Sequence, residues 1–388
     1  MAFDIDQALR YTVERDGSDL HVKVPSPPSV RVDGDLRPME GAEPLSSEDT
    51  EQALDHLLSD ADPKLRAEFD ADGEVDLAYA VPGLSRFRVN AFRQRGVISI
   101  VARAIPFQIR TIDDLGLPSV IRDLAEQQRG IILLTGTTGS GKSTTLAAMI
   151  DHINSTRSCH IVTLEDPIEY LHRDKLSLVN QREVGIDTAS FGRAMRRVLR
   201  QDPDVILIGE MRDEETVRTA LSAAETGHLV LSTLHTLDAT ETINRIIDFF
   251  PPHLQQQARV MLASTLRGAV GQRLVPRIGG RGRAAVCEVL VVTGRVQDLI
   301  LNPEETGKIT DVIAEGEYYG MQTFDQALLK HVMAGSVSEE VALPAASSPH
   351  DFKLMLAAGG QRASGIEQVM GDDADGELDD PLESHFTS

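Results

Sequence analysis

Residues 136–143 have the types and the spacing that hold phosphate groups. They read Gly-Thr-Thr-Gly-Ser-Gly-Lys-Ser and match the pattern G-x-x-x-x-G-K-[ST]. The glycines let backbone N–H groups turn inward around phosphates, the lysine reaches the β- and γ-phosphates, and the last hydroxyl serves Mg²⁺. We therefore expect a nucleoside triphosphate to be bound by Gly136, Thr137, Thr138, Gly139, Ser140, Gly141, Lys142, Ser143 and Thr144.

Two groups of acids follow short apolar segments further along the chain. Glu210 comes after residues 205–208, and Glu165 and Asp166 come after residues 160–164. In open parallel sheets, ligands bind where strands end, and hydrolysis needs a carboxylate that orients water. We expect Glu210 to position or activate water, with Glu165 as second choice. The division between them stays open, and a Mg²⁺ ion is predicted on Ser143, Glu165 and Glu210, directly or through water.

Two histidines flank the apolar segment 229–233. His235 follows it beside Thr233 and Thr236, which makes it a candidate sensor of the γ-phosphate, although a structural role is equally compatible with the pattern. His228 precedes the segment and is predicted among the nucleotide-binding residues. Metal ligation by this pair is not expected, because the sequence offers no third ligand at suitable spacing.

The elements that must position these residues can be read from the hydrophobic pattern. A buried strand precedes the phosphate loop and a helix follows it, and short apolar segments then alternate with helical ones. This order predicts an α/β fold whose parallel sheet has helices on both faces, with helices dominant after about residue 240. The expected strands are 130–135, 160–164, 205–208 and 229–232, and the expected helices are 115–128, 142–153, 191–200 and 214–225.

The first 105 residues predict a separate small domain. A strand at 19–24, a hairpin turning at Asp33-Gly34, a helix over 46–69 capped by Ser47, and three neighbouring strands are expected there. Those three strands span 74–81, 85–92 and 97–104. The predicted organisation is a domain at 1–105, a linker at 106–117, a second domain at 118–355 and an acidic, disordered tail at 356–388.

The composition limits the classes of function. Of 388 residues, 41% are hydrophobic and 25% charged, as in ordinary globular proteins, and the net charge of −22 opposes general binding to nucleic acid or anionic lipid. No Lys or Arg follows Arg362, so the tail is expected to be a solvated terminus or a site for a partner. Cys159 and Cys287 show no metal or disulfide spacing, which favours a reducing cytoplasm. Neither a signal peptide nor an apolar run of the ~20 residues that span a membrane is evident.

Four segments resemble the Walker A, Asp box, Walker B and His box of the secretion-superfamily ATPases. These are the hexameric motors of type II secretion and type IV pili. The segments are 136–145, 163–170, 202–213 and 226–236. Further segments resemble the pilus-retraction motors of this family over about residues 1–355, namely 17–22, 86–92, 178–184 and 320–325.

The resemblance implies a PAS-like α+β N-terminal domain joined to a RecA-like P-loop ATPase domain with a helical C-terminal part. It implies a homo-hexamer with ATP and Mg²⁺ at subunit boundaries. The partner it implies is a pilus platform protein of the inner membrane, reached from the cytoplasmic face. It also implies that N-terminal arginines reach the nucleotide; Arg86, Arg88 and Arg103 are the candidates, and pairing on a solvated sheet face is the alternative for each.

One departure keeps other functions open. Retraction motors carry Ala-Ile-Arg-Asn-Leu-Ile where this chain has Arg-Val-Gln-Asp-Leu-Ile at 295–300, so the Arg-Asn pair associated with retraction is absent. The first hypothesis is a hexameric ATPase motor that powers type IV pilus retraction and twitching motility. The second is a motor for pilus assembly or secretion, or an accessory retraction motor. The third is a nucleic-acid-dependent ring ATPase, which the acidic charge and 4% aromatic content oppose. Four arginines at helical spacing could face nucleic acid or, as we favour, an acidic subunit neighbour: Arg193, Arg196, Arg197 and Arg200.

Overall fold

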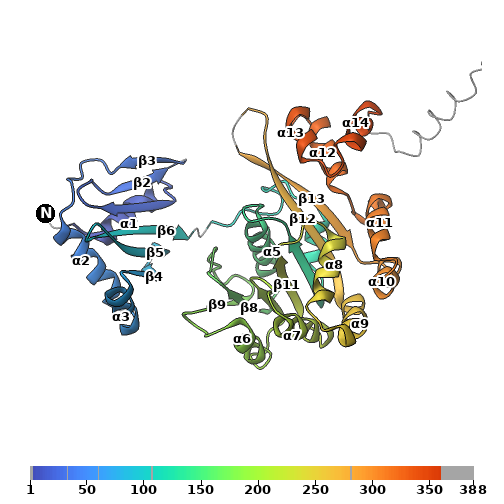
Figure 1. Ribbon diagram of the computed structural model, residues 1–388, viewed down its shortest axis with the longest axis horizontal. Coiled ribbons are helices and arrows are strands. Elements are labelled where there is room, and N and C mark those ends of the chain that lie inside the picture. The colour runs from blue at the N-terminus through green and yellow to red at the C-terminus, as the bar shows by residue number, and fades with distance from the viewer. Residues whose placement is uncertain (1–2, 33, 60, 106–107, 280–281, 360–388) are drawn as a thin grey trace, which may run out of the picture. The chain divides into compact units, whose positions relative to one another are not determined.

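A computed structural model describes residues 3–32, 34–59, 61–105, 108–279 and 282–359 (Figure 1). The chain divides into two compact units, residues 1–109 with 167–173, and residues 110–166 with 174–388. Linker positions 106–107 and most of the predicted acidic tail, residues 360–388, lie outside the described residues. No helix of the described residues is both long enough and apolar enough to cross a membrane.

The N-terminal unit is a six-stranded antiparallel sheet, in the order β3-β2-β1-β6-β5-β4, with three helices. Alternate residues of β5 enter the core, where Phe87, Val89 and Ala91 are fully buried. The elements are α1 (Ile5–Glu14), β1 (Asp19–Lys23), β2 (Ser29–Val32), β3 (Asp35–Pro38), α2 (Ser47–Leu58), α3 (Pro63–Asp72), β4 (Glu74–Val81), β5 (Ser85–Gln94) and β6 (Val97–Ile105).

The predicted strands of this unit are confirmed, but its helices differ from the prediction. The expected helix over 46–69 is two helices, because Pro63 starts α3 and disfavours helical backbone at the residue before it. Ser46, not Ser47, caps α2, in a reciprocal pair of hydrogen bonds with Asp49. The sequence analysis missed α1. Of the predicted turn, Asp33 lies outside the described residues.

The C-terminal unit contains a seven-stranded sheet in the order β13-β12-β7-β11-β10-β8-β9. All neighbours are parallel except β12 and β13, so the predicted α/β fold with a mostly parallel sheet is confirmed. The strands are β7 (Gly130–Thr135), β8 (His160–Glu165), β9 (Leu178–Glu183), β10 (Val205–Ile208), β11 (Leu229–Leu234), β12 (Leu266–Pro276) and β13 (Arg283–Val291).

Helices dominate after residue 240, as expected, but two strands that were not predicted, β12 and β13, also follow that point. Glycines and polar residues interrupt the apolar pattern of β12, so it resembles neither an alternating nor a continuously buried strand. The helix predicted over 115–128 is shorter in the structure, where α4 spans Val120–Ala125. The other helices of this unit are α5 (Lys142–Thr156), α6 (Phe191–Val198), α7 (Glu214–Glu225), α8 (Ala239–Asp248), α9 (Gln255–Thr265), α10 (Gly294–Leu301), α11 (Ile309–Glu315), α12 (Phe324–Met333), α13 (Glu339–Ala345) and α14 (Pro349–Ala357).

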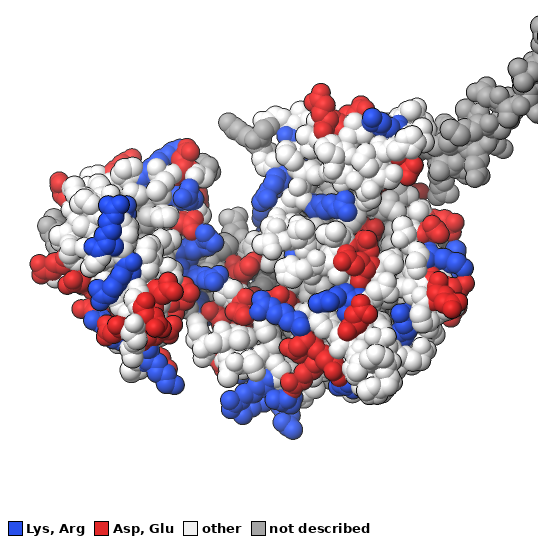
Figure 2. All heavy atoms as spheres, viewed as in Figure 1, with Lys and Arg blue, Asp and Glu red and all other residues white. Residues whose placement is uncertain are grey.

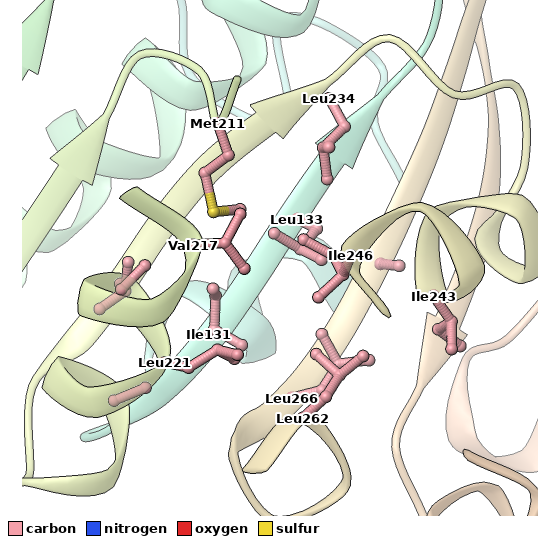
Figure 3. Packing of buried hydrophobic residues seen from close by; sticks show 14 of the residues in the cluster. Ile131, Leu133, Met211, Val217, Leu221, Leu234, Ile243, Ile246, Leu262 and Leu266 are labelled. Carbon is pink, nitrogen blue, oxygen red and sulfur yellow. The ribbon is translucent and has the colours of Figure 1, made fainter. Parts of the chain in front are cut away.

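Helices cover both faces of this sheet. Ile131 and Leu133 of β7 enter the core on one face, and Ile132 and Leu134 enter the core on the other, all with no exposed surface. Figure 3 shows the first face, where Ile131 and Leu133 lie among side chains from α7, α8 and α9. Each such side chain contributes roughly 1.5–3 kcal/mol on burial, so β7 is held firmly on both sides.

One carboxyl is buried on the outer strand of this sheet. Glu288 of β13 is 5% exposed and accepts a hydrogen bond from the N–H of Ala239, the first residue of α8, at 2.8 Å. Burial raises the pKa of Glu288 to about 7; the bond from Ala239 and the charge of Arg273 oppose the rise, and Asp238 and Asp325 add to it.

Because folding raises the pKa of Glu288 from 4.5 to about 7, stability falls as the pH rises through that window. Glu288→Gln keeps an acceptor for Ala239 but cannot ionise. We expect its free energy of unfolding, relative to the parent, to rise by roughly 2–3 kcal/mol between about pH 5 and about pH 7.5. Urea unfolding at both pH values measures this. An offset that does not change with pH would contradict the assignment.

Candidate active site

The loop of residues 136–141 joins β7 to α5 in a conformation that requires glycine. Gly136 has φ +137°, and a Cβ there would lie 2.4 Å from the carbonyl oxygen of Gln272 and 2.7 Å from Ser140 Oγ. Gly141 has φ +91°, and its Cβ would lie 2.7 Å from Gln272 Nε2. The loop can therefore pack against β12 only because both positions lack side chains.

The same loop presents groups that fit a phosphate. Its last residue, Gly141, is the N-cap of α5, so no side chain satisfies the N–H groups at the start of this 15-residue helix. Such helix starts bind anions. The buried hydroxyl of Ser140 has no hydrogen-bond partner among the described residues. Thr137 and Thr138 are exposed, and Ser143 and Thr144 are half-buried in the first turn of α5.

Lys142 is folded back onto the loop. Its side chain donates from Nζ to the carbonyl oxygens of Gly136, at 2.6 Å, and Thr137, at 3.0 Å, and the residue is 8% exposed. The ammonium group is thus held at the loop itself. A phosphate bound there would take the place of these carbonyl oxygens as the partner of Lys142.

Glu210 lies just past β10 and is held by contacts from two sides. The preceding residue, Gly209, donates its N–H to Leu164 of β8 at 2.8 Å and accepts a hydrogen bond from Thr233 Oγ1 of β11 at 2.7 Å. The Glu210 carboxylate is 15% exposed and pairs with Arg212 and, at 3.4 Å, with His235 Nε2. The hydrogen bond to Glu210 raises the pKa of Arg212.

Glu165 is the last residue of β8 and is also held in place. Its Oε1 accepts hydrogen bonds from Thr163 Oγ1 at 2.6 Å and from Gln181 Nε2 of β9 at 3.1 Å. The side chain is half-buried. Two polar neighbours therefore orient this carboxylate before any ligand arrives.

The strand register puts most of the predicted residues on one edge of the sheet. Leu164 pairs with Ile208, Ile208 with Ser232, and Thr135 with Leu234, so the carboxyl ends of β7, β8, β10 and β11 lie side by side. The phosphate loop, Glu165, Glu210 and His235 all follow these ends.

His228 lies at the opposite edge of the sheet. It precedes β11, accepts the N–H of Gly130 at the start of β7, and places Nδ1 at 2.9 Å from the carbonyl oxygen of Ala223 in α7. A strand of six residues spans about 20 Å, so His228 stands that far from the loop. Its contacts support a structural role in closing α7, and the contact with nucleotide stays a prediction.

The three predicted arginines belong to the N-terminal unit. Arg88 of β5 pairs in register with Arg103 of β6. Arg103 Nε donates to Asp19 at 2.8 Å. Burial alone would raise the pKa of Asp19, but hydrogen bonds from Ser18 and Arg103 outweigh it and hold the pKa below its ordinary value. Arg103 thus bonds to Asp19 on its own sheet. Arg88 is exposed and Arg86 is half-buried.

The sequence analysis missed several residues that support the site. Arg212, Thr163 and Gln181 orient the two carboxylates, and Thr233 fixes the turn before Glu210. All four lie inside the segments that carry the family resemblance, which was a usable signal. The described residues contain no group of three or more His, Cys, Asp or Glu side chains that could hold a metal ion. Mg²⁺ in nucleotide sites takes one or two carboxylates plus phosphate oxygens, so this donor set remains compatible with it.

A glycine-rich loop between a buried strand and a helix, faced by carboxylates at the ends of neighbouring parallel strands, defines a P-loop ATPase. The profile of the family Type II/IV secretion system protein matches residues 71–343, and the chain belongs to that family of secretion ATPases.

Proteins of known role match nearly the whole chain. The Type IV pilus retractation ATPase PilT of Pseudomonas aeruginosa is 44% identical over 90% of this chain and all of its own length. The Type IV pilus ATPase PilU of the same organism is 41% identical over 92% of each chain. A crystal structure of the pilus retraction motor PilT with bound ADP superposes with a TM-score of 0.80 at 43% identity, covering 90% of this chain and 98% of that one.

Two glycines of the loop offer a matched test of its packing. Gly136→Ala would place a methyl group 2.4 Å from the carbonyl of Gln272, whereas Gly139→Ala, at φ +80°, would meet nothing within 4 Å. Both carry the left-handed backbone cost of about 1–2 kcal/mol, but only the first collides. We expect Gly136→Ala to weaken ATP binding at least about 10-fold more than Gly139→Ala, since about 1.4 kcal/mol is tenfold. Equal affinities by isothermal titration would contradict the packing argument.

Proposed function

We propose that this chain forms a ring of six subunits and hydrolyses ATP to power the retraction of a type IV pilus. The observation that carries the proposal is the end-to-end match, at 44% identity, to a pilus retraction ATPase. A relative named Twitching motility protein, from Neisseria gonorrhoeae, is 44% identical over 81% of this chain. The structural match to a retraction motor over both units supports the same activity.

In the proposed reaction the phosphate loop binds the triphosphate and Lys142 leaves the loop carbonyls for the phosphate oxygens. Glu210 orients the attacking water, since its carboxylate is fixed by Arg212 and His235 at the strand edge beside the loop. Glu165 is the second candidate for the carboxylate that orients this water. Mg²⁺, held by Ser143 with Glu165 and Glu210 directly or through water, would neutralise charge on the phosphates. His235, 3.4 Å from Glu210, would register the γ-phosphate.

We propose Arg86, Arg88 and Arg103 as the candidate N-terminal arginines that stabilise charge on the transferring phosphoryl group. Arg103 also donates a hydrogen bond to Asp19 on its own sheet. A positive charge that arrives with a separate unit would couple hydrolysis to unit movement, which is what a motor requires.

The proposed partners are other copies of this chain and a platform protein at the inner face of the membrane. Arg193, Arg196 and Arg197 are exposed on α6, and Arg200 lies just past its end. Figure 2 shows Lys and Arg side chains gathered where Figure 1 draws α6. Arg196 pairs with Glu215 of α7. Within a chain of net charge −22, we propose that this face meets an acidic surface of a neighbouring subunit.

An accessory motor is the second candidate, and a sequence change in α10 favours it. In α10, Leu299 and Ile300 are buried in the core, whereas Gln297 and Asp298 stand where retraction motors carry Arg-Asn. Leu299 and Ile300, which this chain shares with the retraction motors, pack in the core. Gln297 and Asp298, which differ, lie on the side of the helix outside the core. A nucleic-acid-dependent ATPase finds no comparable support.

Glu210→Gln should separate binding from chemistry. The amide keeps the size of the side chain but loses the negative charge that orients water, so we expect ATP affinity within about threefold of the parent and hydrolysis reduced at least about 100-fold. Phosphate release and equilibrium binding measure the two. Arg212→Gln, which removes the partner and keeps the carboxylate, is the control and should lose less activity. Full activity of Glu210→Gln would overturn the assignment.

Deleting the gene tests the direction of force. Cells that lack a retraction motor should accumulate surface pili and lose twitching, and the parent gene, but not a Lys142→Ala copy, should restore both. Pilus counts by electron microscopy decide the matter. Bald cells would indicate an assembly motor, and normal pilus numbers with weakened retraction against load would indicate the accessory role.

A further inference from the structure

One buried glutamine outside the predicted site contacts both ends of the phosphate loop. Gln272 lies on β12, the strand that pairs in parallel with β7, and is 3% exposed. The register pairs Gly271 with Thr135, the last residue of β7. Gln272 therefore stands beside Gly136, where the loop begins.

Each polar group of Gln272 has a place against the loop or the helix after it. The side-chain oxygen Oε1 accepts a hydrogen bond from Thr145 Oγ1, in the first turn of α5, at 2.8 Å. The Nε2 atom lies 2.7 Å from where a Cβ of Gly141 would be, and the backbone carbonyl lies 2.4 Å from the corresponding point at Gly136. One residue thus fills the space that both glycines leave open.

The chemistry of an amide suits this position. A carboxylate would bring a negative charge beneath a loop that binds phosphates, and a hydrocarbon would leave the buried hydroxyl of Thr145 without this acceptor, at a cost of about 1–3 kcal/mol. Thr145 is 1% exposed, so water cannot readily replace the lost bond. A neutral side chain with an acceptor toward α5 and a donor toward the loop meets both needs.

We propose that Gln272 is a positioning residue for nucleotide binding, which fixes the start of α5 against β12. The N–H groups at the start of α5 and the ammonium group of Lys142 must point at the same phosphates, and both follow the orientation of this helix. Tying Thr145 to the neighbouring strand sets that orientation before ATP arrives, so less ordering accompanies binding. The proposal rests on the ATPase site and not on the retraction role.

The test measures binding of a fluorescent, non-hydrolysable ATP analogue to the full-length chain. Gln272→Leu should raise its Kd about 10-fold, and the KM for ATP should rise with it while kcat stays within about threefold, the pattern of lost ground-state binding. Thr145→Val removes the other partner without a change of shape and should have a similar effect. The double variant should be no weaker than the worse single one, because both changes delete one interaction.

Gln322→Leu is the matched control. Gln322 is also buried, at 8% exposed, and its amide donates to the carbonyl of Cys287 on β13 at 2.8 Å. This variant should lower the melting temperature and leave the Kd unchanged. If it weakens binding as much as Gln272→Leu does, or if Thr145→Val binds like the parent, Gln272 serves stability alone and the proposal fails. Thr145→Val also decides the matter should Gln272→Leu not fold.

Discussion

The close approach of the phosphate loop to β12 is the contact on which the rest of the site depends. At Gly136 the backbone runs so near the carbonyl of Gln272 that no side chain fits, and the φ of +137° there turns the chain from β7 into α5. That turn aims the helix start and Lys142 at a common point. The loop is thus shaped by sheet packing, and the sheet in turn is fixed by β7, whose side chains are buried on both faces.

The parallel sheet also brings the candidate catalytic residues together at one edge. Glu165 and Glu210 are far apart in the chain, but Glu165 ends β8 and Glu210 lies two residues past β10, and neighbouring strands set the register of both. Short polar contacts then orient the carboxylates: Thr163 and Gln181 hold Glu165, and Arg212 and His235 hold Glu210. Carboxylates and cationic side chains are already oriented at this edge, so a bound triphosphate would contact charged groups that need little rearrangement.

Much of this could be predicted from the sequence, because the phosphate loop and the apolar strands have strong local signals. Strands β7 and β10 and helix α7 were placed to the residue. β12 and β13 could not be, since Gly268 and Gly271 break the pattern and burial on both faces removes the alternation. Gln272 was missed with its strand. His228 and His235 mark the two ends of β11, so they lie at opposite edges of the sheet.

The central claim is that a nucleotide binds at the edge formed by residues 136–145, Glu165 and Glu210. Amide hydrogen exchange of the full-length chain, with and without a non-hydrolysable ATP analogue and Mg²⁺, tests it most directly. The account predicts slower exchange at residues 136–145 and at the turn around Glu210, with no change around His228. Unchanged exchange at 136–145, or protection centred on residues 226–228, would contradict it.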